Sequence, residues 1–433
     1  MIRPTRVWRA AAVLATATLV LSACGSDNGD GDGGDSAAEP TASESADTGD
    51  AAPKGDGKLH VGTLLPQTGD LAFLGPPEFA GVDAAIADIN AAGGVLGQDV
   101  TQTKADSGDG TPDIAGAQVD KLLEANSDVV IGAAASGVSL SVINKITEAG
   151  VAQFSPANTS PAFDDAETDP EELYFRTAPS DVLQGAVLSN LVIEDGHSNV
   201  AILARQDSYG ELLAAQTEQG ITGGGANVAA KILYSADATN YTAEINEVAA
   251  AKPDAIVLIA FNETTKIIPQ LVSKGIGPKD VQVYFVDGNT ADYSEDFPPG
   301  TLEGVRATYP GAELTGDFRE RMLEADPDLK EFTYGPESYD ATILTALAVI
   351  AADSDDATVF GPEIINVSRD GTECATFEEC KDLLEEGEDI DYQGVSGPVD
   401  LGDTGSPTKA TIGIFEYDAD NTYKNVDYIT GVI

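Results

Sequence analysis

The segment VVIGAAASGVSLSVINKITEAGVAQFSPANTSP, Val129 to Pro161, decides the fold of this chain. It predicts a buried strand at 129–131, a helix from about Val138 to Gly150 and a second strand at 153–154. Each strand ends in a turn of small polar residues, and a parallel sheet places two such turns side by side. Open α/β folds bind ligands at these strand ends, where the free N–H groups of a helix N-terminus favour an anion. The segment therefore predicts a carboxylate site.

The same alternation of strand and helix continues on both sides of this segment. Earlier in the chain, we expect strands at 61–65 and 100–104 and helices at 76–90 and 112–125. After Thr177 the pattern restarts, with strands at 200–204, 228–233, 255–260 and 281–286. Such regular alternation indicates α/β architecture with parallel sheets covered on both faces. A chain of 433 residues is too long for one core and suits two domains.

The first 23 residues predict an export signal. Three arginines precede an apolar run at 10–21, which is too short to span a membrane comfortably. The sequence LSAC at 21–24 resembles a bacterial lipobox, which implies signal removal and lipid attachment at Cys24. The alternative is an ordinary signal peptide with a chance cysteine. We expect the mature protein to be exported and lipid-anchored to the outer face of the bacterial cytoplasmic membrane.

Residues 25–57 predict a disordered acidic linker rich in Gly, Ser and Asp. They contain no aromatic residue and no Ile, Leu or Val, so they cannot bury enough apolar surface to fold. Such a segment would give the folded part reach from the membrane. The Asp-Gly run at 27–35 suggests calcium, but it lacks the spacing and the final Glu of an EF-hand loop.

The composition is strongly acidic, with 73 Asp and Glu against 23 Lys and Arg and a formal net charge of −50. Loss of the three signal arginines would bring the mature chain to about −53, so nucleic acid, which needs a basic face, is not an expected partner. The acidic residues are spread over the whole chain. This spread indicates solubility or a saline habitat, two explanations that the composition does not separate.

Two cysteines remain once Cys24 is lipidated. Cys374 and Cys380 enclose ATFEE, and in an oxidising exported compartment a local disulfide is expected. Zinc is a poor alternative because the only histidines, His60 and His197, sit in no metal-ligand spacing. We therefore expect neither a metal nor a cofactor.

Seven stretches occur in an order that resembles a known family: KLHVGTLLPQTGDLAFLG, INAAGGVLGQ, VVIGAAASGVS, FSPANTSP, YFRTAPSD, DSYG and SYDA. Together they resemble the type I periplasmic binding proteins, in particular the leucine/isoleucine/valine-binding branch that serves ABC transporters. The resemblance covers the chain from Lys58 to Ile433. It implies two Rossmann-like lobes with parallel sheets, joined by a three-crossing hinge and closing on a small ligand. The first lobe is expected at 58–178 and 308–392, the second at 179–307 and 393–433.

The resemblance assigns three residues of the first lobe to the ligand. Ser136 matches the family serine that binds the α-carboxylate, and a helix N-cap is the alternative reading. The Ala157 carbonyl and the Thr159 hydroxyl match contacts of the second turn, to the ligand ammonium and carboxylate respectively. The alternative is that these residues only form a turn.

Two residues of the second lobe complete the implied site. Tyr209 matches a tyrosine that lies over the ligand, or it is an ordinary aromatic residue at a strand end. Asp287 aligns with an acidic residue that pairs with the ligand ammonium, because a carboxylate buried on closure needs a charged partner. The family more often has Glu there, so the shorter Asp leaves the amine of the ligand open, and an Asp-Gly turn is the alternative.

Aromatic and hydroxyl residues near these positions are further candidates. Phe261, followed by Asn262, occupies a position where the family often presents an aromatic side chain. Phe73 and Phe163 are plausible contacts from the first lobe, although core packing explains a phenylalanine equally well. Thr68 fits the turn after the first strand, where it either touches ligand or shapes the loop.

These features predict a substrate-binding lipoprotein that delivers a small amino acid, branched-chain or otherwise apolar, to the permease of an ABC importer. The alternatives are a ligand sensor of the same fold, or a binding protein for amides, urea or aromatic acids, in which Asp287 would lose its role. An enzyme is not expected. The chain contains no Gly-x-Ser-x-Gly elbow on a strand-to-helix turn, no Walker loop and no dinucleotide fingerprint.

Overall fold

The structure is a computed structural model that describes residues 55–108 and 112–433. The predicted signal, Cys24 and the predicted linker up to residue 54 lie outside the described residues. Within the described part, no helix is both long and apolar enough to cross a bilayer.

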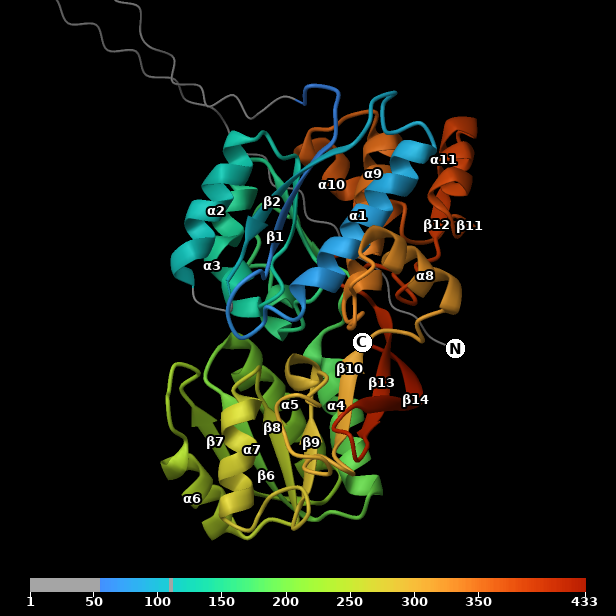
Figure 1. The fold of residues 1–433 in the computed structure, drawn as a ribbon. Coiled ribbons are helices and arrows are strands. Elements are labelled where there is room, and N and C mark those ends of the chain that lie inside the picture. Colours follow the sequence, from blue (N-terminus) through green and yellow to red (C-terminus); the bar gives the residue numbers. More distant parts are fainter. Residues whose placement is uncertain (1–54, 109–111) are drawn as a thin grey trace, which may run out of the picture. The chain divides into compact units, whose positions relative to one another are not determined.

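The first sheet has five parallel strands in the order β2-β1-β3-β4-β5. They are β1 (His60–Leu65), β2 (Thr101–Asp106), β3 (Val129–Gly132), β4 (Ala152–Ser155) and β5 (Tyr174–Arg176). Helices α2 (Pro112–Glu124) and α3 (Ser136–Thr147) cover one face, and α1 (Gly75–Ala91), α9 (Gly335–Ala352) and α10 (Ala357–Asn366) cover the other (Figure 1). Alternate residues of β3 serve the two faces: Val130 packs with α2 and α3, whereas Val129 and Ile131 pack with α1 and α9. We call this sheet with its helices the first lobe.

The second sheet has seven strands in the order β14-β13-β10-β9-β8-β6-β7. They are β6 (Asn199–Arg205), β7 (Asn227–Tyr234), β8 (Ala255–Ile259), β9 (Gln282–Phe285), β10 (Arg306–Pro310), β13 (Lys409–Tyr417) and β14 (Tyr423–Val432). Strands β6 to β10 are parallel, and β13 and β14 form an antiparallel hairpin at one edge. Helices α4 (Asp181–Glu194) and α5 (Ser208–Gly223) cover one face, while α6 (Thr242–Ala251) and α7 (Thr264–Ser273) cover the other. We call this sheet with its helices the second lobe. The expected α/β class with two mainly parallel sheets is confirmed.

The remaining elements complete the first lobe. They are α8 (Gly316–Ala325), the two-stranded sheet of β11 (Thr372–Cys374) and β12 (Ile390–Tyr392), and α11 (Phe377–Glu386). The expected disulfide between Cys374 and Cys380 is present and ties β11 to α11. Lys381, which follows it, donates to the carbonyls of Ala92 and Gly94 and so satisfies the end of α1.

Two lobe boundaries differ from those expected. Strand β10 pairs with β9 and β13, so Thr308 belongs to the second sheet and the chain crosses back only after Pro310. Val399 and Leu401 are buried in the core of the first lobe, so the last crossing lies between Leu401 and β13. In both places strand pairing and apolar burial decide the boundary, whereas the sequence marks only turn residues.

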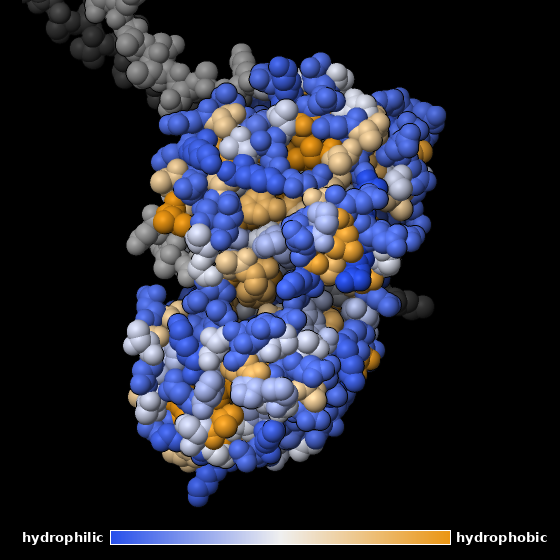
Figure 2. All heavy atoms as spheres, in the orientation of Figure 1, coloured by the Kyte–Doolittle hydropathy of each residue, from blue (hydrophilic) through white to orange (hydrophobic). Residues whose placement is uncertain are grey.

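Hydrophilic side chains dominate the face of the molecule seen in Figure 2, and the apolar spots on it are small and separate. This agrees with the excess of 73 acidic over 23 basic residues.

Candidate ligand-binding cleft

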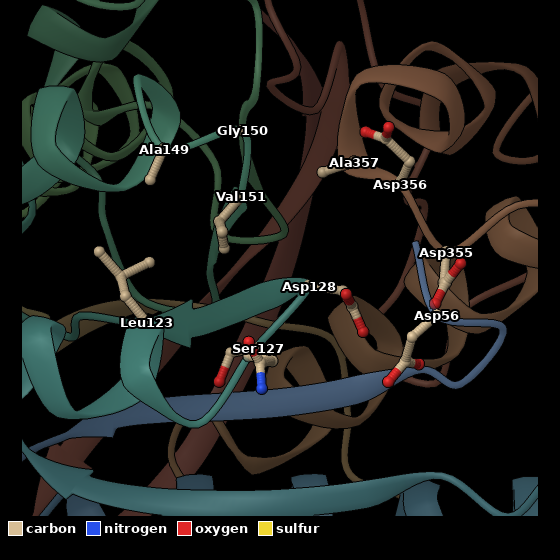
Figure 3. A pocket seen from close by; sticks show the side chains of 11 residues that line it. Asp56, Leu123, Ser127, Asp128, Ala149, Gly150, Val151, Asp355, Asp356 and Ala357 are labelled. Atoms are coloured by element: carbon tan, nitrogen blue, oxygen red, sulfur yellow. The ribbon is translucent and has the colours of Figure 1, made fainter. Parts of the chain in front are cut away.

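An acidic hollow lies at the amino ends of the first-lobe strands. Asp56, Asp128, Asp355 and Asp356 line this space of about 360 Å³ (Figure 3). The pKa of Asp128 is raised to about 7, chiefly by burial, while the His60 N–H opposes the rise and the neighbouring aspartates contribute to it. Four carboxyl groups disfavour an anionic ligand, and open α/β sheets bind at the opposite, carboxyl ends of their strands. The carboxyl ends of the strands are therefore the candidate site.

The two turns of the opening segment do lie side by side at the carboxyl ends of β3 and β4. Asn158 Nδ2 donates to the carbonyls of Ala133 at 3.0 Å and Ala134 at 2.8 Å, and Ser155 Oγ donates to Ala133 at 2.7 Å. Ser136, 3% exposed at the start of α3, accepts the Ser160 N–H at 3.4 Å. Side-chain hydrogen bonds thus hold the two turns in one rigid rim.

Arg176 anchors the second turn, which contains Asn158 and Ser160. Its side chain is fully buried, and Nη1 donates to the carbonyls of Asn158 at 3.2 Å and Ser160 at 2.8 Å. Nη2 pairs with Asp164 at 2.6 Å, and Nε donates to Ser406 at 2.8 Å. From the sequence, this arginine is only part of the YFRTAPSD stretch of the family resemblance, so its role in shaping the second turn was missed.

Asp287 is the centre of the second-lobe contribution. Its Oδ1 accepts hydrogen bonds from the Tyr209 hydroxyl at 2.5 Å and from Gln184 Nε2 at 2.9 Å. Its Oδ2 accepts from the Tyr334 hydroxyl at 2.8 Å, and Tyr334 stands at the N-terminus of first-lobe helix α9. Burial raises the pKa of Asp287, and the hydrogen bonds from Tyr209, Gln184 and Tyr334 lower it. The Tyr334 hydroxyl thereby joins the two lobes across the cleft.

A second buried carboxyl, Asp181, lies close to Asp287. It opens helix α4 with no exposed surface, and neither of its carboxylate oxygens makes a hydrogen bond with the described residues. Burial raises its pKa well above the usual value and Asp287 raises it further, while the nearby Thr159 hydroxyl and Arg176 lower it. The Thr159 hydroxyl itself has no partner of good geometry. Asp181 and Asp287 are therefore two neighbouring buried acids, and no cation among the described residues donates a hydrogen bond to Asp181.

Asp181 is not singled out by the sequence, because Ser or Asp at the start of a predicted helix is ordinarily explained as a helix cap. In the structure Ser180 is the N-cap residue, but its side chain makes no capping hydrogen bond. Two acceptor residues in a row at a helix start were the available signal, since one cap needs only one of them.

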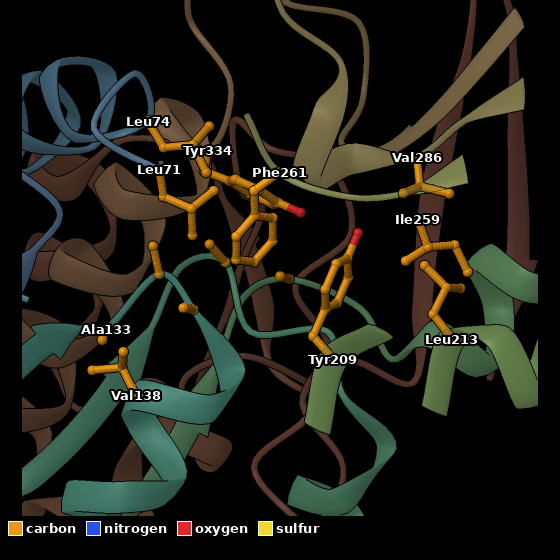
Figure 4. Close-up of a cluster of buried hydrophobic side chains, with 14 of the residues drawn as sticks. Leu71, Leu74, Ala133, Val138, Tyr209, Leu213, Ile259, Phe261, Val286 and Tyr334 are labelled. Carbon is orange, nitrogen blue, oxygen red and sulfur yellow. The ribbon is translucent and has the colours of Figure 1, made fainter. Parts of the chain in front are cut away.

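A small cavity of about 20 Å³ remains where the two lobes meet, enough for about one water molecule. Figure 4 shows the apolar side chains around it, with Leu71, Leu74 and Tyr334 gathered near Phe261 and Tyr209 beside them. The full lining is Leu71, Leu74, Ala134, Ala135, Ser136, Ala157, Tyr209, Phe261, Asp287, Gly288 and Tyr334. One acid, Asp287, thus lines this space among mostly apolar and aromatic side chains.

The structure brings most of the predicted site residues together. The predicted residues that line the cavity are Ser136, Ala157, Tyr209, Phe261 and Asp287. Thr159 is also buried but does not line the cavity. Their roles toward a ligand stay predictions.

Three other candidates lie elsewhere. Thr68 is exposed, and its hydroxyl donates to Asp106 at 2.7 Å. Phe73 packs against the core without lining the cavity, and Phe163 stacks on Tyr174 with ring centroids 4.4 Å apart. Leu71 and Leu74, from the same loop as Thr68, supply the first-lobe apolar wall instead. The described residues contain no grouping of His, Cys, Asp and Glu with the arrangement of a metal site.

Two α/β lobes that meet over a cavity at the carboxyl ends of their strands define a two-lobed solute-binding protein. Residues 58–421 match the periplasmic binding protein family, and the chain belongs to this family. It is therefore an ABC-type solute-binding protein of the extracytoplasmic kind and not an enzyme.

Two curated relatives show the range of functions among similar sequences. A chemotactic signal transduction system substrate-binding protein, BasB of Halobacterium salinarum, is 26% identical over 354 residues, covering 79% of this chain and 83% of that protein. The Leu/Ile/Val/Thr-binding protein of Salmonella typhimurium is 30% identical over 171 residues, covering 39% of this chain and 46% of that protein.

Solved structures agree in fold. A leucine-binding protein of Thermotoga maritima matches with a TM-score of 0.71 at 19% identity, over 86% of this chain and 98% of that one. A solute-binding protein of R. palustris in complex with 4-hydroxybenzoate matches with a TM-score of 0.70 at 15% identity, over 86% and 97%. At these identities the likeness concerns the fold alone.

Proposed function

We propose that this protein captures a small amino acid with an apolar side chain and delivers it to the permease of an ABC importer. The ligand carboxylate would bind Ser136 and the N–H groups at the start of α3. The ammonium would lie between Asp287 and Asp181, with the apolar side chain against Leu71 and Phe261. A site with hydrogen-bond donors on one rim and acids on the other suits an amphoteric ligand, because such a ligand carries both a carboxylate and an ammonium.

The pair of buried acids is the observation that supports the proposal most. Asp181 and Asp287 are both buried, and Asp287 raises the pKa of Asp181 beyond the effect of burial. A cation between them would offset that cost and would give the unpartnered oxygens of Asp181 hydrogen-bond donors. A ligand without an amine leaves this acid pair without a cation.

Two alternatives have specific support. The aromatic side chains of Tyr209, Phe261 and Tyr334 around the cavity favour an aromatic acid. The similarity to a chemotactic substrate-binding protein over 79% of the chain favours a receptor as the downstream partner in place of a permease.

A thermal shift screen of the signal-less protein separates these ligand classes. Amino acids, amides, urea and aromatic acids are each added in excess, and a ligand at a hundred times its dissociation constant adds about 2.7 kcal/mol of stability. We expect apolar amino acids to raise the melting temperature. A response to benzoates or amides with none to amino acids would contradict the proposed ligand.

The two acids are then tested directly. Asp287→Asn and Asp181→Asn should each weaken amino-acid binding by about a hundredfold or more, because truncating one partner of a buried charge pair costs 3–5 kcal/mol. Asp195→Asn is the matched control, since this aspartate pairs with Arg306 in the same lobe and does not line the cavity. Unchanged affinity in both cleft variants would refute the assigned ammonium site.

The lipid anchor at Cys24 belongs to the same proposal. Cys24→Ser in the full-length precursor should abolish incorporation of labelled palmitate into the protein, because the sulfur atom that would carry the lipid is lost. Equal labelling of the variant and the wild type would contradict lipidation at this cysteine.

A further inference from the structure

An unusual buried arginine stands behind the aromatic wall of the cleft. Arg205 ends strand β6 and is 4% exposed. Its Nη1 donates to Glu263 at 2.8 Å and its Nε to Asp207 at 2.5 Å. The guanidinium carbon lies 3.4 Å from the ring centroid of Phe261, a close cation–π contact. Arg205 does not line the cavity, so it does not reach a ligand itself.

Glu263 joins the arginine to the backbone of the same phenylalanine. This glutamate has no exposed surface, and while Oε1 pairs with Arg205, Oε2 accepts the Phe261 N–H at 2.7 Å. Gly288 confines the ring further, because a Cβ there would approach it to 2.7 Å. The main chain and the ring of Phe261 are thus held by one ion pair and one close backbone approach.

The contacts continue from Phe261 to the acid of the cleft. The rings of Phe261 and Tyr209 stack with centroids 5.5 Å apart and planes 21° apart. The Tyr209 hydroxyl then donates to Asp287 at 2.5 Å. Three consecutive contacts therefore link the Arg205 guanidinium to the carboxylate that faces the cavity.

We propose that Arg205 is a positioning residue that fixes the aromatic wall and thereby sets which apolar side chain the cleft accepts. Because the planar guanidinium is hydrogen-bonded to both Glu263 and Asp207, it fixes the plane of the Phe261 ring. The Phe261 ring in turn fixes the ring of Tyr209. A wall that cannot tilt discriminates between ligand side chains of different size, whereas a mobile wall adapts to several. This inference rests on the proposed function, because it concerns the ligand of the same cleft.

The test compares dissociation constants for leucine and alanine by titration calorimetry. Arg205→Met should reduce the ratio of leucine affinity to alanine affinity roughly tenfold, a change that corresponds to the free energy of a well-made cation–π contact. Arg205→Lys keeps the charge but loses the planar fork, so it should resemble Arg205→Met and also serves if the methionine variant does not fold. Arg306→Met, which removes another arginine–aspartate pair of the second lobe, should leave the ratio unchanged.

A double-mutant cycle separates positioning from a general structural role. If Arg205 acts through Phe261, then Arg205→Lys should not alter the ratio further in a Phe261→Leu background. An unchanged ratio in the single variants, or equal effects with and without Phe261, would overturn the proposal.

Failure of the proposed function gives a distinct result. If the wild type binds no amino acid, the ligand assignment is wrong, and the crystal structure of Arg205→Lys decides the positioning role. A displaced Phe261 ring would support that role for whatever ligand binds, and a ring in its present place would refute it.

Discussion

Glu337→Gln is expected to flatten the pH dependence of stability. Glu337 stands in the first turn of α9 with 3% exposure, and burial raises its pKa to about 8, with Asp340 adding to the rise and its own backbone N–H opposing it. Because this pKa is raised, the folded protein holds a proton that the unfolded chain has already released. Stability from this group is therefore present at low pH and is lost as pH rises from the unfolded value of 4.5 toward 8.

The size of the effect follows from the two pKa values. Each unit of difference corresponds to 1.36 kcal/mol, so between pH 5 and pH 8 the titration of Glu337 costs about 3.5 kcal/mol of stability. Glutamine has nearly the same shape and does not titrate. Neighbouring Glu78 of α1 is fully buried, and neither of its oxygens has a hydrogen-bond partner among the described residues. Burial raises the pKa of Glu78 and Glu337 raises it further, so loss of the Glu337 charge also lowers the pKa of Glu78 and adds to the gain in stability at high pH.

Urea unfolding at the two pH values measures the difference. The free energy of unfolding of Glu337→Gln minus that of the wild type should be about 3.5 kcal/mol larger at about pH 8 than at about pH 5. Glu386→Gln, at an exposed position of α11, makes the same chemical change as a control. If the Glu337 and Glu386 variants show the same pH dependence, the reasoning about the buried carboxyl is refuted.

Three further expectations concern charge, crosslinking and the rim of the cleft. Raising NaCl from about 0.1 M to about 1 M should raise the melting temperature, because it screens a formal charge of −50; a lower value would contradict net repulsion. Replacing Cys374 and Cys380 by Ser should cost about 2.2 kcal/mol in urea unfolding, given their separation of 6 residues; no loss would contradict the loop-closure account. Arg176→Met should cost about 3–5 kcal/mol and weaken ligand binding, because Asn158 and Ser160 lose their anchor; full affinity would exclude that role.

The first-lobe rim was predictable because its signals are local. The segment from Val129 to Pro161 was expected as strand, helix and strand, and it forms β3, α3 and β4 in that order. Helix α3 begins at Ser136, earlier than the expected Val138, because Ala135 is the extended N-cap residue. Apolar periodicity and small turn residues lie within one stretch of chain, so neighbours along the sequence report on them.

The second half of the cleft depended on contacts that no local pattern records. Tyr334 reaches Asp287 from a residue with a φ of 60°, a left-handed conformation that favours Gly and is not signalled by a tyrosine. From the sequence, Phe73 was named, and not Leu71 or Leu74, because an aromatic residue in a binding loop is the more usual candidate for a ligand contact. Which of three adjacent apolar side chains faces the cleft depends on how the loop folds over α1.

The hinge crossings show the same limit. The turn residues around Pro310 indicate that the chain bends there, but not on which side of the bend the strand pairs. Pairing of β10 with β13, about a hundred residues later in the chain, decides the lobe of Thr308. Long-range antiparallel pairing of this kind leaves no periodic trace at either strand.

The contact between Tyr334 and Asp287 has a kinetic consequence. A cavity of about 20 Å³ is too small to admit an amino acid, so association must follow separation of the lobes. The Tyr334 hydroxyl donates to the carboxylate that is proposed to bind the ligand amine, so the two would compete for it. Ser160 adds a second contact by donating to the Ser208 carbonyl at 3.1 Å. The observed rate of binding should therefore level off at high ligand concentration, at the rate of opening. The apparent affinity is then lower than the intrinsic one by the fraction of molecules that are open.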